Sequence, residues 1–230
     1  MKRYKLYLFD FDGTLLNTMS ALEYVFTMGY AHVGIKFDPK YTVEFARIPL
    51  SEGYKKMNGN PEKWLEFVDY IQKALDFPKA ITSNEPYEES LEFMRYLKDN
   101  NIHAGIVTSN KTTHVKDVLK VFDIPIDTFD IYMGNQEYTR FKPHPEPILM
   151  AIKASKKDYK LEDVVYVGDG MNDALCAINA GVDAVLIDRY NEHPDSDKYI
   201  STIKSPKVEF ILTLFSFASI FSVKRYNPLY

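Results

Sequence analysis

Two aspartates that share one side of a strand are the first residues of this chain whose types and spacing could do chemistry. Residues 4–9 (YKLYLF) form an apolar run that predicts a buried strand, and residues 10–14 (DFDGT) follow it directly. Because alternate side chains of a strand point the same way, Asp10 and Asp12 should repel each other unless a cation or a shared proton is present. Mg²⁺ would meet this need, since it prefers carboxylate oxygens. The alternative is an ordinary polar turn, in which Asp and Gly are common.

The residues beside these aspartates, and a second acidic pair, suit the same chemistry. Gly13 lets the backbone leave the strand sharply and approach a ligand closely, and Thr14 offers a hydroxyl donor. Asp169 follows another apolar run over residues 164–167, and Asp173 comes four residues later. These two carboxylates could therefore meet at one cation.

Hydroxyl and amide side chains follow a third apolar run, over residues 104–107. Thr108, Ser109 and Asn110 stand between this predicted strand and a predicted helix over residues 113–122. A hydroxyl at the end of a parallel strand can hydrogen-bond a phosphate oxygen, although an ordinary helix N-cap gives the same pattern.

A lysine on a proline-rich segment could supply a fixed positive charge. Residues 140–147 read RFKPHPEP, so three prolines hold the chain extended around Lys142 and suit the start of a helix near residue 146. A lysine held in this way is a placed point charge, whereas an isolated lysine would be an ordinary surface residue. We interpret the neighbouring His144 as a surface residue.

The elements that must position these side chains alternate between strands and helices. Beyond the runs already named, strands are predicted over residues 129–133 and 181–187, and helices over residues 86–98 and 174–179. This alternation predicts an α/β fold with a doubly wound, mostly parallel sheet. Ligands bind at the carboxyl ends of the strands in such sheets, where all the residues above are expected.

A block without a clear strand signal interrupts this alternation between residues 16 and 85. Helices are predicted from near Ser20, as a possible N-cap, and over residues 48–57 and 61–75. The last of these carries an apolar stripe that is typical of a core face. The block therefore reads as a helical insertion into the α/β domain.

Composition excludes several classes of protein. The chain has 230 residues, a net charge of −4 and a sequence pI near 5.8, which argues against a dedicated nucleic-acid surface. Its one cysteine, Cys176, leaves no intrachain disulfide or thiolate metal cluster and indicates a cytoplasmic protein. The first strand begins too early to leave room for a signal peptide.

An apolar segment near the end of the chain needs its own interpretation. A short edge strand is predicted over residues 199–203, and a final helix from near Pro206. Residues 208–223 are mostly apolar but shorter than the ~20 residues of a membrane span, and they include Glu209. We expect a terminal helix packed on the core, or a subunit contact, and leave a monomer or a homodimer open.

Four short motifs in order give the chain a family resemblance. Residues 10–14, Thr108 after its strand, residues 142–145 (KPHP) and residues 168–173 (GDGMND) resemble the four motifs of the haloacid dehalogenase superfamily. Among members with a cap, the chain is similar to phosphoglycolate phosphatases and to β-phosphoglucomutase. The resemblance implies a Rossmann-like core over residues 1–15 and 86–230, with an all-helical cap over residues 16–85.

The resemblance also implies roles for the four aspartates. Asp10 would be the nucleophile that forms an aspartyl-phosphate, and Asp12 the general acid and base. Mg²⁺ would be held by Asp10, Asp169 and the backbone carbonyl of Asp12, with Asp173 as a further ligand or a partner of one.

The remaining motif residues would hold the phosphoryl group. Lys142, Thr108 (with Ser109 as the alternative) and the backbone N–H groups near Phe11 to Thr14 would meet the charge of the phosphoryl oxygens.

Two residues would contact the rest of the substrate. Asn110 is expected to contact the phosphate or the substrate, and Arg47, in the cap loop, to clamp a substrate carboxylate or a second phosphate. Alternatively, Arg47 is a surface residue.

The function expected from this set is Mg²⁺-dependent hydrolysis of a small phosphorylated metabolite, such as phosphoglycolate or a sugar phosphate. The alternatives are a phosphomutase, a pyrophosphatase and a non-catalytic binding protein built on a phosphatase scaffold.

Overall fold

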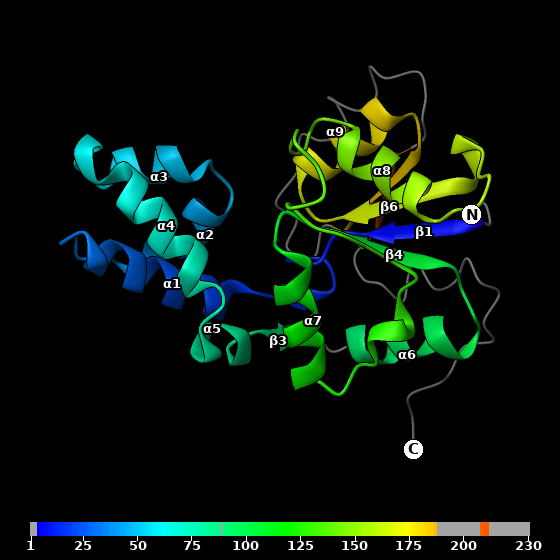
Figure 1. Ribbon diagram of the computed structural model, residues 1–230, viewed down its shortest axis with the longest axis horizontal. Helices are drawn as coiled ribbons and strands as arrows, with labels where there is room; N and C mark the ends of the chain where they lie inside the picture. The colour runs from blue at the N-terminus through cyan, green and yellow to red at the C-terminus, as the bar shows by residue number, and fades with distance from the viewer. Residues whose placement is uncertain (1–3, 88, 188–207, 212–230) are drawn as a thin grey trace.

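Six parallel strands form the central sheet of the computed structural model, which describes residues 4–87, 89–187 and 208–211. Their spatial order is β5-β4-β1-β6-β7-β8, and every neighbouring pair is parallel (Figure 1). The strands are β1 (Leu6–Phe9), β4 (Ala104–Val107), β5 (Ile131–Met133), β6 (Val164–Gly168), β7 (Asp183–Ile187) and β8 (Val208–Ile211). The chain runs from β1 outward through β4 to β5, and then returns to β6 on the other side of β1. This reversal confirms the predicted doubly wound sheet.

Alternating side chains of the strands pack under helices on both faces of the sheet. Phe9 and its like-facing neighbours contact α6 (Ser90–Asp99) and α7 (Thr112–Val121), and Leu8 and its neighbours contact α8 (Glu146–Ala154) and α9 (Met171–Ala180). Figure 1 shows these pairs of helices on opposite sides of the sheet. Because both faces are covered, the strands are apolar throughout instead of alternating. Short 3-10 turns, η3 (Ile126–Thr128) and η4 (Leu161–Asp163), precede β5 and β6.

The inserted block is helical and has an apolar core of its own. It contains α1 (Met19–His32), α2 (Thr42–Ala46), α3 (Leu50–Lys56), α4 (Trp64–Ala74) and α5 (Pro78–Thr82), with the turns η1 (Pro39–Tyr41) and η2 (Pro61–Lys63). Tyr30 and Tyr54 pack against Phe67 at its centre, with ring centroids 4.7 and 4.6 Å from that of Phe67. This separate core supports our proposal that residues 16–85 form a cap domain and that residues 1–15 and 86–230 form the catalytic core.

Several boundaries differ from the sequence prediction. Two-residue strands β2 (Leu16–Asn17) and β3 (Glu85–Pro86) pair antiparallel at the two ends of the helical block, where no strand was predicted. Strands this short carry no periodic pattern, so the sequence could not reveal them. Helix α1 begins at Met19 with Thr18 at its N-cap, instead of Ser20.

The final helix predicted from near Pro206 was wrong for the residues that the structure describes there. Residues 208–211 form strand β8 beside β7. Valine, phenylalanine and isoleucine suit a strand at least as well as a helix, and the open edge of β7 gives this segment its hydrogen-bond partner. The predictions for residues 199–203 and 212–223 lie outside the described residues. Of the helices described, none is long and apolar enough to cross a membrane.

Candidate active site

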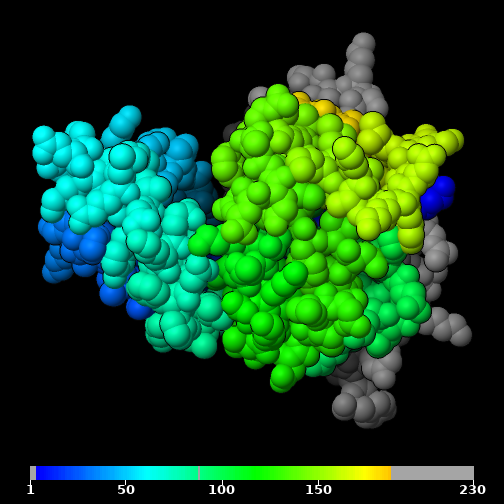
Figure 2. Space-filling view, in the orientation of Figure 1, coloured from blue at the N-terminus to red at the C-terminus, as the bar shows by residue number. Residues whose placement is uncertain are grey.

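Polar residues at the strand ends line one cavity of about 770 Å³, which lies between the core and the helical block. Figure 2 shows the surface hollowed along the seam where the blue-to-cyan block meets the green core. The register of the sheet explains why these residues lie close together on the core side. Phe9 of β1 pairs with Ile106 of β4 and with Val167 of β6, so these three strands end side by side. Of the residues predicted for the site, those that line the cavity are Asp10, Asp12, Gly13, Arg47, Ser109, Lys142, Asp169 and Asp173.

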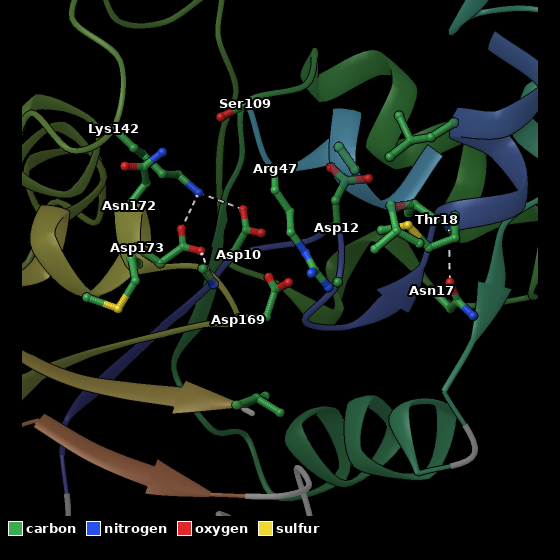
Figure 3. A pocket seen from close by; sticks show the side chains of 18 of the residues that line it. Asp10, Asp12, Asn17, Thr18, Arg47, Ser109, Lys142, Asp169, Asn172 and Asp173 are labelled. Atoms are coloured by element: carbon green, nitrogen blue, oxygen red, sulfur yellow. Dashed lines mark hydrogen bonds and ion pairs between the residues drawn. The ribbon is translucent and has the colours of Figure 1, made fainter. Parts of the chain in front are cut away.

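A buried lysine joins two of these aspartates (Figure 3). The Nζ atom of Lys142 lies 2.6 Å from Asp10 Oδ1 and 2.8 Å from Asp173 Oδ1, and the lysine side chain is only 7% exposed. Burial alone would lower the pKa of Lys142, but the two carboxylates raise it above its ordinary value. Lys142 therefore stays charged and fixed beside Asp10.

Asp173 is held from two further sides. The Tyr166 hydroxyl lies 3.1 Å from Asp173 Oδ1, and the backbone N–H of Gly170 donates to Asp173 Oδ2 over 3.1 Å. Lys142 also lies 5.3 Å from the centre of the Tyr166 ring, within cation–π range. Asp173 and Tyr166 together keep the ammonium group aimed at Asp10.

The donor set fits a divalent cation. Asp10, Asp169 and Asp173 each offer a carboxylate oxygen, and these oxygens lie within 4.8 Å of one another. Burial raises the pKa of Asp10 well above its ordinary value, and burial together with repulsion from Asp173 raises that of Asp169 to about 7. Oxygen-only ligands and uncompensated negative charge are what Mg²⁺ requires.

The position of Asp169 depends on the two residues after the first aspartate pair. Gly13 has a φ of 75°, and a Cβ atom added there would lie 2.2 Å from Asp169 Oδ2. The Thr14 hydroxyl donates to Asp169 Oδ1 over 3.1 Å. The absence of a side chain at Gly13 thus leaves the space that Asp169 occupies. Thr14 orients Asp169 through this hydrogen bond and does not itself line the cavity.

Asp12 is turned toward the residues that follow β4. The Asn110 side chain donates from Nδ2 to Asp12 Oδ2 over 2.7 Å, and the Thr108 hydroxyl lies 3.5 Å from the same oxygen. Burial raises the pKa of Asp12 above its ordinary value, while the charges of His114 and Lys142 and the Asn110 hydrogen bond oppose this. The structure therefore places Thr108 and Asn110 at Asp12, whereas Ser109 faces the cavity.

The helical block contributes Arg47 to the opposite wall. Arg47 follows the last turn of α2, and Val43 and Ala46 of the same helix also line the cavity. Figure 3 shows its side chain directed toward the region between Asp12 and Asp169. A cation therefore faces the carboxylates from the cap side.

Sequence reasoning missed the residues that hold these groups in place. Asn135 and Tyr138 hydrogen-bond the backbone of residues 108–110, and the carboxylate of Glu146 binds back to Thr139 and Arg140, just before Lys142. His114 is 4% exposed and influences Asp12 from α7. The contacts of Asn135, Tyr138 and His114 join distant parts of the chain, whereas those of Glu146 are local to the polar loop between β5 and α8.

Comparison with known proteins gives one consistent result. The family model described as "Haloacid dehalogenase-like hydrolase" matches residues 7–187. A protein named pyrophosphatase PpaX from Halalkalibacterium halodurans is 30% identical, over 78% of this chain and 81% of its own. One named phosphoglycolate phosphatase from Mannheimia succiniciproducens is 28% identical, over 84% of this chain and 93% of its own.

The fold agrees with solved structures. A proposed haloacid dehalogenase-like hydrolase from Bacteroides fragilis superposes with a TM-score of 0.79 at 24% identity, covering 94% of this chain and all of the other. At this identity, the likeness speaks for the fold alone.

Proposed function

Because the chain belongs to the haloacid dehalogenase-like hydrolase family and is a phosphatase, we propose that it hydrolyses small phosphomonoesters with the help of Mg²⁺ and through a phosphorylated Asp10. The observation that carries this proposal is the position of Lys142 Nζ, 2.6 Å from Asp10 Oδ1 in a cavity that Asp12 also lines. A carboxylate nucleophile, a fixed cation and a second carboxyl group for proton transfer are the parts that such a reaction needs.

In the first step, a carboxylate oxygen of Asp10 attacks phosphorus, and the bond between phosphorus and the ester oxygen breaks. Asp12, protonated at the start, gives its proton to the departing alcohol oxygen. The products of this step are the free alcohol and an aspartyl-phosphate at Asp10.

In the second step, Asp12 acts as a base. It takes a proton from a water molecule whose oxygen attacks phosphorus, and the bond between phosphorus and Asp10 breaks. Inorganic phosphate leaves, Asp10 is again a carboxylate and Asp12 is again protonated, so the cycle closes.

The phosphoryl oxygens need positive partners in both steps. Lys142 and the Ser109 hydroxyl line the cavity in which they would lie, with Thr108 behind Asp12, whereas the N–H of Gly13 already donates to the Leu16 carbonyl over 2.8 Å. Asp10, Asp169 and the Asp12 carbonyl would hold Mg²⁺, with Asp173 beside them. When bound, the ion offsets the charge that would otherwise keep a phosphate away from Asp10.

Arg47 favours substrates with a second anionic group. A guanidinium matches a carboxylate or a phosphate bidentately, and this one enters the cavity from the wall opposite Lys142. Phosphoglycolate has a carboxylate at one end and a phosphate at the other, so it suits this arrangement. Pyrophosphate is the second candidate, because its second phosphate would also suit Arg47 and a relative of 30% identity is named a pyrophosphatase.

A substrate panel tests the proposal. We would measure phosphate release from phosphoglycolate, pyrophosphate, sugar phosphates and nucleotides, with Mg²⁺ and with a chelator. Release that requires Mg²⁺ and disappears in Asp10→Asn is expected, with the most active substrate carrying two anionic groups. Release that continues in Asp10→Asn would contradict the proposed nucleophile. Conversion of sugar phosphates without phosphate release would indicate a mutase instead.

A further inference from the structure

We propose that Asn110 positions the carboxyl group of Asp12 and fixes which of its two oxygens carries the transferred proton. This inference rests on the proposed role of Asp12 as general acid and base. It gives Asn110 a role different from the substrate contact expected from the sequence, because Asn110 is not among the residues that line the cavity, whereas its neighbour Ser109 is.

The contact between the two side chains pairs an amide donor with a carboxylate acceptor. Asn110 Nδ2 lies 2.7 Å from Asp12 Oδ2. An amide NH₂ group only donates hydrogen bonds, so Oδ2 must accept, and a proton on Oδ2 would meet the amide hydrogen. The Thr108 hydroxyl approaches the same oxygen at 3.5 Å. The transferred proton is therefore carried by Oδ1.

This arrangement serves both states of the reaction. When Asp12 is ionised, Oδ2 accepts from Asn110 as a carboxylate oxygen. When Asp12 is protonated on Oδ1, Oδ2 is a carbonyl oxygen and still accepts. The same hydrogen bond can therefore hold Asp12 in one orientation while the proton is gained and lost, which is what a general acid and base needs.

The backbone that carries Asn110 is itself held in place. Three successive carbonyl groups, those of residues 108, 109 and 110, accept hydrogen bonds from the Tyr138 hydroxyl, Asn135 Nδ2 and the Asn135 backbone N–H, at 2.8, 2.8 and 2.9 Å. A Cβ atom on Gly134 would lie 2.6 Å from the Asn110 carbonyl oxygen, so the two loops pack directly on each other. A side chain on such a supported backbone can orient a catalytic group accurately.

Leaving-group dependence of kcat/KM separates a positioning role from a substrate contact. This constant reports the steps up to departure of the alcohol. An alkyl alcohol must receive a proton from Asp12, whereas p-nitrophenolate leaves without one. For Asn110→Leu, we expect kcat/KM to fall about 100-fold with an alkyl phosphate and only about threefold with p-nitrophenyl phosphate.

Two further variants make the test decisive. Asn110→Ala removes the donor and adds no bulk, so it should show the same selective loss even if the leucine variant folds poorly. Asn100→Leu is the matched control, because its exposed amide only donates to the Tyr96 carbonyl; it should leave both constants unchanged. Equal losses with both substrates, or no loss, in the Asn110 variants would overturn the inference.

Asp12→Asn distinguishes failure of the inference from failure of the proposed function. If Asp12→Asn loses alkyl phosphate activity selectively and the Asn110 variants do not, then only the role of Asn110 is wrong. If Asp12→Asn shows no selectivity either, then the role proposed for Asp12 is wrong, and the inference falls with it.

Discussion

The ammonium group of Lys142 lies 2.6 Å from Asp10 Oδ1, although 132 residues separate the two in the chain. The side chains are 7% and 9% exposed, so little water weakens their attraction. Asp10 stands at the end of the central strand, and Lys142 arrives on the loop before α8, where Asp173 holds it at 2.8 Å. The ammonium group of Lys142 thus compensates part of the charge of a buried acidic cluster, and this gives the first prediction.

Replacing Lys142 with methionine should abolish most of the activity and weaken the fold. Loss of one positive group at the phosphoryl oxygens should lower kcat/KM by at least about 100-fold. The carboxylates left without their partner should cost about 3–5 kcal/mol at neutral pH without Mg²⁺. Enzyme assays and urea unfolding measure the two effects.

Lys5→Met is the control for this substitution. Lys5 pairs with Asp163 at 2.9 Å, but its side chain is 68% exposed. We expect a change in stability of at most about 1 kcal/mol and normal activity. A Lys142→Met enzyme as active and as stable as Lys5→Met would contradict the account of the site.

Replacing Gly13 with alanine should damage the site more than the fold. The new Cβ would lie 2.2 Å from Asp169 Oδ2, so the Asp169 carboxylate would have to move away from Gly13 and leave its present position. We expect a weaker apparent affinity for Mg²⁺ and a large loss of kcat, measured by titrating activity with Mg²⁺.

Gly34→Ala separates this effect from backbone strain. Gly34 has a φ of 83°, close to the 75° of Gly13, and no atom lies within 4 Å of a Cβ built there. Both variants should lose about 1–2 kcal/mol of stability from the left-handed backbone conformation. Only Gly13→Ala should change the Mg²⁺ response, and a similar response in both variants would refute this reading.

The Glu146 carboxylate should stabilise the loop before Lys142 in a pH-dependent way. It accepts from the Thr139 N–H at 2.9 Å and from Arg140 Nε at 2.9 Å, and these contacts lower its pKa from 4.5 to about 2. Because the pKa is lower in the folded state, this stabilisation is present above pH 4.5 and is lost as the pH falls toward 2. The difference in unfolding temperature between wild type and Glu146→Gln should therefore shrink across that range. A difference independent of pH would show that the charge of Glu146 does not matter.

Arg47→Leu should change substrate preference instead of the chemical step. We expect KM for phosphoglycolate and pyrophosphate to rise at least about tenfold, because a charged hydrogen bond is lost. KM for an alkyl phosphate with an uncharged tail should change little. Lys55→Leu is the matched control, because Lys55 is an exposed residue of α3 and is not among the residues that line the cavity. The role of Arg47 would be contradicted if Arg47→Leu and Lys55→Leu changed KM equally. It would also be contradicted if Arg47→Leu raised KM equally for all substrates.

The sequence predicted the elements and motifs well where the signal is local. The strands β1, β4 and β6 are runs of consecutive buried, mostly apolar residues. Asp10 directly follows β1, and Asp169 directly follows β6. The family resemblance is confirmed by the match over residues 7–187. Each of these features depends on residues that are neighbours in the chain.

Features that depend on packing escaped prediction. Tyr166 reads as a core residue of a strand, yet its hydroxyl contacts Asp173 in the site. Asn110 was expected to contact the phosphate or the substrate, yet β4 brings it to Asp12, 98 residues away. Strand β8 was assigned to a helix because its pairing with β7, and not its own pattern, decides its conformation.

The most direct test of the proposed function is to find the phosphoryl group on the enzyme. Protein mixed with substrate and Mg²⁺ would be quenched in acid during turnover, reduced with borohydride and digested for mass spectrometry, because the reduction converts an aspartyl-phosphate to homoserine. We expect homoserine at position 10, with Asp12 unmodified, and no conversion when substrate is omitted. An active enzyme with no modified residue, or with the modification at a residue other than Asp10, would contradict it.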